Sequence, residues 1–114
     1  MAKLIQEKDV KKEMQQIGAD AWAVEYMLDK SKFRIIKVEN VRNAIANILK
    51  QEMLSIGGDV AVNKGCVNCS VEKSDVLIMG TVRQIRKLIN KMDNQVSEST
   101  DIAEEIKEIL DRLC

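Results

Sequence analysis

The chain has 114 residues, of which 46% are hydrophobic and 32% charged, a balance typical of one folded domain and unlike that of a disordered chain. Eighteen basic and eighteen acidic side chains cancel, and the only aromatic residues are one Trp, one Tyr and one Phe, so the composition argues against nucleic-acid binding. Because the chain contains no histidine, it lacks the usual acid–base group at neutral pH and the commonest metal ligand.

The apolar runs are far shorter than the roughly 20 residues that span a bilayer, and the start of the chain lacks the apolar segment of a signal peptide. We therefore expect a cytoplasmic protein with no membrane partner. Three cysteines, an odd number, do not make a disulfide framework, and a reducing cytosol keeps them as thiols.

The N-terminal part of the chain predicts a short edge strand and two helices. The strand would occupy residues 3–6. Asp9 is placed to cap a helix that runs to about Ile17 and stops at Gly18. Residues 20–28 then predict a second, shorter helix.

A strand, a long helix and a second strand are expected next. Residues 33–38 are short and rich in β-branched residues, which predicts a strand with both faces at least partly covered. Asn40 would cap a helix over residues 41–56, Gly57-Gly58 would end it, and residues 59–62 would begin another strand. The apolar residues of this helix repeat every 3.6 residues: Val41, Ala44, Ile45, Ile48, Leu49, Met53 and Ile56.

The following segment contains a buried strand and a well-marked helix. Residues 66–71 are expected to pair only loosely, and residues 75–79 predict a strand that ends at Gly80. Thr81 and Gln84 form the capping-box pattern of a helix, since each side chain can bond the other residue's backbone N–H. The apolar face of that helix is Val82, Ile85, Leu88, Ile89 and Met92.

The chain ends in a linker, residues 94–100, and a helix over residues 101–114 that Asp101 and Glu104 would cap. A helix of this length is marginal alone, so its apolar face must pack on its own domain or on a second copy. Together the elements predict a single α+β domain, with residues 1–93 as its α/β core. We expect a two-layer α/β sandwich with a small mixed sheet, a ferredoxin-like βαββα core and extra N- and C-terminal helices.

Cys66 and Cys69 have the C-x-x-C spacing of redox pairs and zinc sites. A redox pair is typically placed at a helix N-terminus, whereas these cysteines lie between two predicted strands. A structural zinc ion needs four ligands, and only Cys114 and carboxylates would remain to complete the set. The plain interpretation is two structural cysteines, with a redox or metal role as the alternative.

Gly80, Thr81, Arg83 and Arg86 are the candidate ligand-binding residues. They lie where a strand ends and a helix begins, so backbone N–H groups and the two arginines could hold an anion. The plain interpretation is helix capping. Gly57-Gly58 has the opposite order, helix before strand, which is wrong for a phosphate loop.

Three carboxylates, Asp59, Glu72 and Asp75, flank the central predicted strands. A buried pair of them could act in acid–base catalysis, but acids at strand ends are usually solvated. We therefore assign no catalytic residue.

Residues 49–81, LKQEMLSIGGDVAVNKGCVNCSVEKSDVLIMGT, with KVENV before them and RQIRKLINKM after them, resemble the N-terminal extension of a subset of bacterial and archaeal dihydropteroate synthases. The most specific parts are LKQEM, GGDVAV and SDVLIMGT. The resemblance covers about residues 17–109.

The resemblance implies that the synthase chemistry, which joins a pterin pyrophosphate to p-aminobenzoate, is carried by a separate (β/α)₈ barrel. Such a barrel takes about 200 residues or more, so this chain would be a stand-alone domain without it. No catalytic residue can be transferred from the barrel to this sequence.

We therefore expect a non-catalytic accessory, regulatory or assembly domain that is linked to folate and pterin metabolism and needs no cofactor. The expected partners are a second copy, forming a homodimer, and a separate pterin-binding barrel protein. The first alternative is a protein that binds a pterin or another small anion. The second is a thiol switch or metal-binding protein centred on Cys66 and Cys69.

Overall fold

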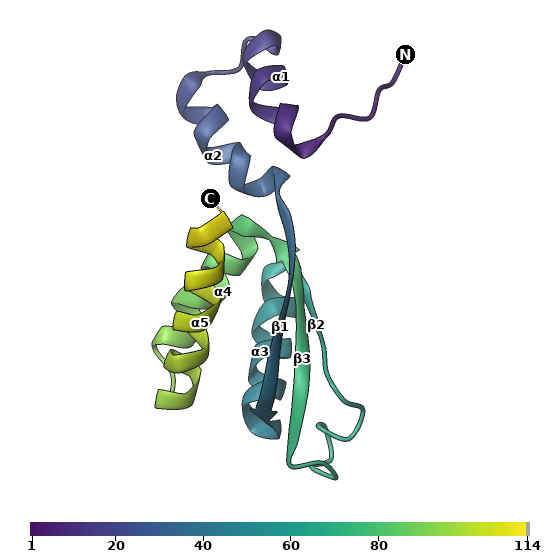
Figure 1. Cartoon of the computed structure of the whole chain (residues 1–114), viewed down its shortest axis with the longest axis vertical. Helices are drawn as coiled ribbons and strands as arrows, with labels where there is room; N and C mark the ends of the chain where they lie inside the picture. Colours follow the sequence, from purple (N-terminus) through teal and green to yellow (C-terminus); the bar gives the residue numbers. More distant parts are fainter. Residues whose placement is uncertain (114) are drawn as a thin grey trace.

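The computed structural model describes residues 1–113 and shows an elongated α+β molecule of 52 × 30 × 23 Å (Figure 1). Its elements, in chain order, are η1 (Glu7–Asp9), α1 (Val10–Ile17), α2 (Ala21–Ser31), β1 (Phe33–Arg42), α3 (Asn43–Ile56), β2 (Asp59–Ala61), β3 (Lys73–Thr81), α4 (Val82–Asp93) and α5 (Ser97–Leu113). The expected α+β two-layer sandwich with extra helices at both ends is confirmed.

The three strands form one sheet in the order β1-β3-β2. β3 lies between the other two and pairs antiparallel with both, so that Ile78 is opposite Ile36 on β1 and Val60 on β2. The helical crossover through α3 leaves a gap between β1 and β2, and β3 returns into it, as in a split βαβ unit. All pairs in the sheet are therefore antiparallel, in place of the expected mixed sheet.

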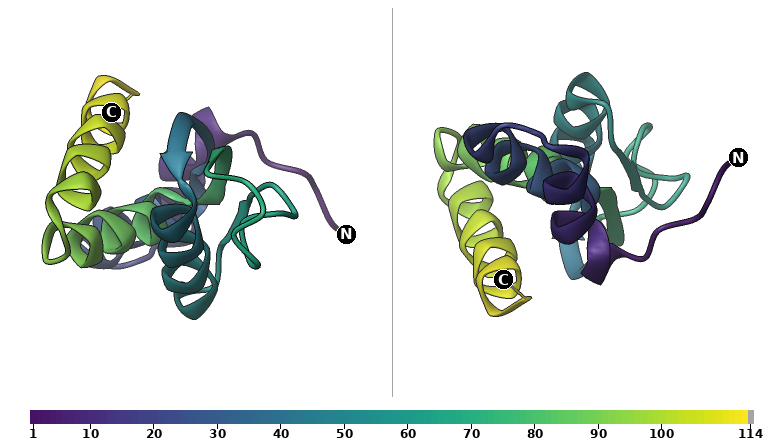
Figure 2. Two further views of the ribbon diagram at one scale, coloured as in Figure 1. Left: turned by 90° about the horizontal axis from the view of Figure 1, so that it is seen from below. Right: turned by 90° about the horizontal axis from the view of Figure 1, so that it is seen from above.

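One face of the sheet is covered by helices α3 and α4, and α5 packs beside α4 (Figures 1 and 2). The buried residues of β3 alternate along the strand, as the pleat requires, so Val76 and Ile78 face the helices. The fully buried side chains that fill this core include Ile45, Leu49, Met53, Ile85, Leu88, Met92, Ile106 and Leu110. Burial of these apolar side chains is the main favourable term in folding.

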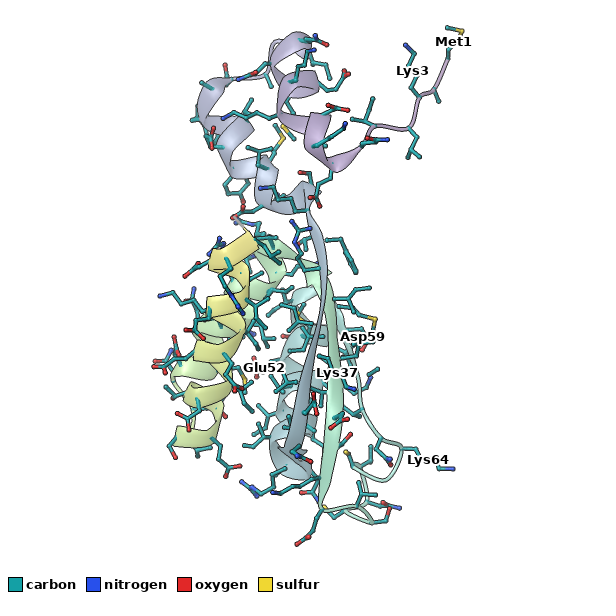
Figure 3. The ribbon with its side chains drawn as sticks, viewed as in Figure 1. Met1, Lys3, Lys37, Glu52, Asp59 and Lys64 are labelled. Atoms are coloured by element: carbon teal, nitrogen blue, oxygen red, sulfur yellow. The ribbon has the colours of Figure 1, made fainter. Side chains whose placement is uncertain are left out.

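The opposite face of the sheet is open. Phe33 and Ile35 on β1 are 55% and 61% exposed, and Leu77 on β3 is 36% exposed. Lys37 on β1 and Asp59 on β2 are also exposed on these strands (Figure 3). The expectation that both faces of the first strand would be covered is therefore wrong, because α3 and α4, the helices that cover the sheet, lie on its other side.

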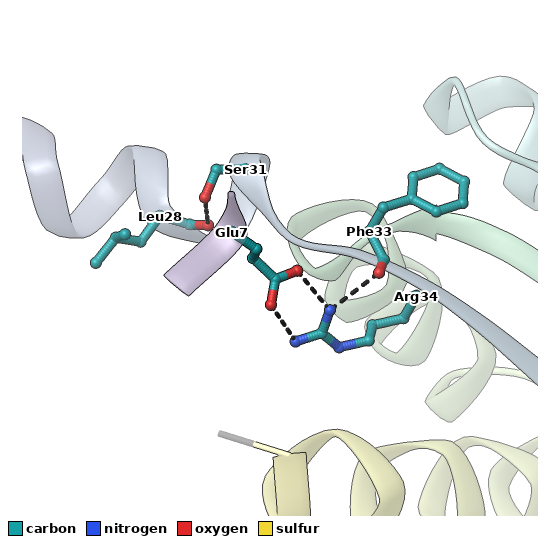
Figure 4. Close-up of polar contacts among 5 residues, drawn as sticks. All are labelled: Glu7, Leu28, Ser31, Phe33 and Arg34. Carbon is teal, nitrogen blue, oxygen red and sulfur yellow. Dashed lines mark hydrogen bonds and ion pairs between the residues drawn. The ribbon is translucent and has the colours of Figure 1, made fainter. Parts of the chain in front are cut away.

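Helices α1 and α2 pack on each other beyond one end of the sheet (Figure 1). No residue of α1 is buried, and in α2 only Val24 is. The Arg34 guanidinium ties η1 to β1, since its two terminal nitrogens donate to the Glu7 carboxylate at 2.7 and 3.2 Å (Figure 4). The edge strand expected at residues 3–6 is absent from this part of the structure, which runs extended into η1.

The long helix starts at Asn43, not at the expected cap Asn40. Asn40 has a φ of 55° and lies at an irregularity of β1, where the pairing with β3 shifts between Val38 and Val41. Its backbone N–H donates to the Asp75 carboxylate at 3.0 Å. A strand bulge therefore takes the place of the predicted helix cap, and Val41 is buried from the strand.

Other helix ends agree with the sequence pattern. α3 ends at Gly57, whose φ of 108° is a left-handed conformation that favours glycine. Thr81 and Gln84 form the expected capping box. α5 begins at Ser97, four residues before Asp101, and it buries Ala103, Ile106 and Leu110 within its own fold.

No helix in residues 1–113 is both long enough and apolar enough to cross a membrane.

Candidate functional site

The junction of β3 and α4 brings together the residues that the sequence singled out for ligand binding. The Thr81 hydroxyl accepts a hydrogen bond from the Gln84 N–H at 3.1 Å, and the Gln84 side-chain oxygen accepts one from the Thr81 N–H at 2.9 Å. The Val82 N–H donates to the Lys32 carbonyl at 2.8 Å. These three N–H groups already have partners, so side chains are the main groups left here to hold an anion.

Gly80 faces the core. A Cβ at this position would overlap the end of the Met53 side chain, which is itself fully buried. The small residue therefore lets α3 approach β3 closely. Gly80, which the sequence named as a candidate ligand-binding residue, therefore has a packing role in the structure.

Arg83 and Arg86 have different surroundings although both lie on α4. Arg86 forms ion pairs with Asp29 on α2 at 3.3 Å and Asp111 on α5 at 3.9 Å, so it joins three helices. The guanidinium carbon of Arg83 lies 4.1 Å from the centre of the Tyr26 ring, a cation–π contact. Arg83 also lines a pocket.

That pocket has a volume of about 360 Å³ and lies where α2 and α4 meet the end of β3. α2 contributes Tyr26 and Lys30, and α4 contributes Arg83, Gln84 and Lys87. Thr81 and the last residue of α3, Ile56, complete the lining. We call these residues the basic pocket, because three of them are cationic and none is acidic.

Sequence reasoning missed Tyr26 and Lys30 as pocket residues. A signal was present in the helical spacing, since Tyr26 and Lys30 are four residues apart on α2, and Arg83 and Lys87 are four apart on α4. Each pair therefore shares a helix face. That the two faces meet depends on the packing of α2 on α4, which no local pattern specifies.

The structure separates the environments of the two cysteines. Cys66 is fully buried and belongs to the core cluster, and its carbonyl accepts from the Asn47 amide at 3.0 Å. Cys69 is exposed, with a φ of 58°. The segment expected to pair loosely, residues 66–71, consists of turns and bends rather than strand.

Metal-ligand clusters are absent from the described residues, where no three Cys, Asp or Glu side chains are placed to share an ion. Cys114, the third thiol considered for a zinc site, lies outside the described residues.

The three carboxylates do not meet. Asp59 is held by its neighbour's N–H, from Val60 at 2.7 Å, and by the Lys50 ammonium at 3.1 Å. These contacts lower the pKa of the Asp59 carboxyl, the backbone hydrogen bond more than the lysine. Asp75 instead bonds the bulge at Asn40, and Glu72 is exposed.

The sequence of the chain is similar to parts of two known proteins. Over 98 residues, 86% of its length, the chain is 28% identical to the bifunctional dihydropteroate synthase/dihydropteroate reductase of Helicobacter pylori. Over 84 residues, 74% of its length, it is 31% identical to a probable bifunctional folylpolyglutamate synthase/dihydropteroate synthase of Halobacterium salinarum. The chain is similar to a segment of dihydropteroate synthase-containing proteins.

This finding confirms the resemblance to dihydropteroate synthases that the sequence indicated. The matched residues are 26% of the Helicobacter protein and 10% of the Halobacterium protein, so the chain spans a small part of either relative. No protein-family model matches the chain, and no solved structure matches it. Both relatives are named for dihydropteroate synthesis, a step of the folate pathway.

Proposed function

We propose that the chain is an accessory domain of the folate pathway, which works beside a dihydropteroate synthase barrel without carrying the synthase chemistry. The match to the Helicobacter protein supports this proposal. Its 98 matched residues are 26% of that protein, which is therefore about 380 residues long. The remainder is long enough for a (β/α)₈ barrel of about 250 residues, so the Helicobacter protein has room for both a barrel and a segment like this chain.

The open sheet face is the surface that we propose for this association. Phe33, Ile35 and Leu77 are large apolar side chains exposed together on neighbouring strands. Contiguous apolar surface of this kind is typical of protein–protein contacts. A barrel that packs on it would complete a second layer over the sheet, while a second copy of the chain, the expected homodimer, would compete for the same face.

Activity measurements test the accessory role. The purified chain should show no synthase activity alone, and it should change the rate or stability of a separate dihydropteroate synthase barrel from the same organism when the two are mixed. A chain that forms dihydropteroate by itself would overturn the proposal. So would a barrel whose rate and stability are both unchanged by an excess of the chain.

A second candidate function is reduction of a dihydropterin. The Helicobacter relative is named for two activities, a synthase and a reductase. If a barrel carries the synthase activity, the segment similar to this chain is a candidate for the reductase activity. Such a reaction would transfer a hydride from a reduced nicotinamide to the carbon of the pterin C=N bond, while a proton goes to its nitrogen.

This candidate is tested by incubating the chain with dihydropteroate and NADPH or NADH, with and without added flavin. Oxidation of the nicotinamide that matches formation of tetrahydropteroate would support a reductase over a purely accessory domain. The absence of turnover under all these conditions would exclude the second candidate and leave the first intact.

A further inference from the structure

The basic pocket gathers three cations at one place in a chain whose net charge is zero. Lys30 on α2 and Arg83 and Lys87 on α4 line it, and no carboxylate does. The whole chain has equal numbers of acidic and basic side chains. The local excess of positive charge is therefore a property of how the helices pack and not of the composition.

Several nearby cations on α1 and α4 have acidic partners. On α4, Arg86 pairs with Asp29 at 3.3 Å and Lys91 pairs with Glu52 at 3.0 Å. On α1, Lys11 pairs with Glu25 of α2 at 3.1 Å. Within residues 1–113, by contrast, none of the three pocket cations forms an ion pair with a carboxylate.

The Tyr26 ring holds two of these cations together. The Arg83 guanidinium carbon lies 4.1 Å from the ring centre, and the Lys30 ammonium lies 4.7 Å from it. Cation–π contacts of this kind contribute about 0.5–1 kcal/mol at exposed sites. Both positive charges therefore lie next to the ring in the pocket lining, where a bound anion would lower their electrostatic energy.

The remaining lining suits a small ligand with a charged end. The Thr81 hydroxyl, which accepts from the Gln84 N–H, keeps its own hydrogen to donate to a ligand oxygen. Ile56 supplies an apolar wall. The volume, about 360 Å³, lies at the small end of the range of ligand pockets, about 300–1,000 Å³.

We propose that the basic pocket binds a phosphorylated small molecule, with its phosphate or diphosphate group among Lys30, Arg83 and Lys87. A planar guanidinium matches two phosphate oxygens at once, and the two ammonium groups add point charges. Three cations suit a group that carries two or more negative charges better than a single carboxylate. This binding needs no barrel, so it can be tested independently of the accessory role.

Calorimetric titration at low salt tests the proposal, with inorganic pyrophosphate as the probe of the charged group and ADP as the probe of a ring-bearing diphosphate. We expect binding of both. The Arg83→Gln/Lys87→Gln variant should lose at least about tenfold in affinity for each, which corresponds to about 1.4 kcal/mol. The matched control is Lys64→Gln/Lys73→Gln, which removes the same charge outside the pocket and should change affinity less than about twofold.

Circular dichroism and the unfolding midpoint establish that each variant is folded. If Arg83→Gln/Lys87→Gln does not fold, Lys30→Gln on the other helix is the second probe and should also lose affinity. Two results would overturn the proposal. One is no binding of either probe at roughly 10 mM, ten times a dissociation constant of about 1 mM; the other is an equal loss of affinity in the control variant.

Discussion

The guanidinium carbon of Arg83 lies 4.1 Å from the centre of the Tyr26 ring, and this contact joins α4 of the core to α2 of the N-terminal helix pair. The ion pair between Arg86 and Asp29 joins the same two helices one turn further along α4. Since α2 buries only Val24, these two contacts have a large share in fixing its position. The basic pocket exists only while α2 stays on α4.

Replacement of Tyr26 tests this attachment. Tyr26→Leu removes both cation–π contacts and should lower the free energy of unfolding by about 1–2 kcal/mol, the sum of two contacts of about 0.5–1 kcal/mol each. Urea unfolding measures the loss. Tyr26→Phe keeps the ring and is the control. An equal loss in both variants would mean that the hydroxyl, and not the ring, holds α2.

Gly80 and Met53 form a second pair that can be tested. Gly80→Ala adds a methyl group where the buried Met53 side chain lies, so it should destabilise the fold by about 1–3 kcal/mol. In Met53→Leu the side chain is shorter, so it no longer reaches the position of the new methyl group. The double variant should therefore be more stable than the sum of the two single losses predicts, and simple additivity in unfolding measurements would contradict the proposed contact.

The two cysteines should react at very different rates. In a Cys114→Ser background, an aromatic disulfide reagent should label the exposed Cys69 within the mixing time and the buried Cys66 only as the protein opens. Mild urea should accelerate only the slow phase. Two fast phases of equal rate in the native protein would contradict this placement and favour a thiol switch.

The pH dependence of stability follows from Asp59. The pKa of its carboxyl is lowered from the ordinary value of an aspartate, first by the Val60 N–H and then by Lys50. A carboxyl with a lowered pKa in the folded state stabilises the fold above the unfolded pKa, and the contribution is lost as the pH falls through the folded value. The stability difference between the wild type and Asp59→Asn should therefore be largest near neutral pH and shrink in acid. A difference that stays constant in urea unfolding from neutral pH down to strong acid would contradict it.

Local signals in the sequence predicted much of the fold. The capping box of Thr81 and Gln84 and the glycine stop at Gly57 depend on neighbouring residues only, and both are present. The start of α3 was wrong because Asn40 is bound in a strand bulge by Asp75, 35 residues away. That contact arises from the pairing of β1 with β3, which the local pattern does not contain.

The open sheet face and the lining of the basic pocket could not be predicted from the sequence for a similar reason. Ile35 and Ile36 are adjacent and equally apolar, so the sequence could not show that the first is 61% exposed and the second buried. In the candidate site, Arg83 was correctly placed near a strand end, but its neighbours Tyr26 and Lys30 come from a helix more than 50 residues earlier. Only the packing of α2 on α4 brings these groups together.

The proposed contact between the open sheet face of this chain and a synthase barrel is tested by sedimentation of the chain mixed with a dihydropteroate synthase barrel from the same organism. We predict a complex of the two proteins. Ile35→Lys on the open face should weaken it, and Val67→Lys, an equivalent change at an exposed valine in the β2–β3 connection, should not. A chain that sediments only with itself or alone, and leaves the barrel free at all concentrations, would contradict the claim.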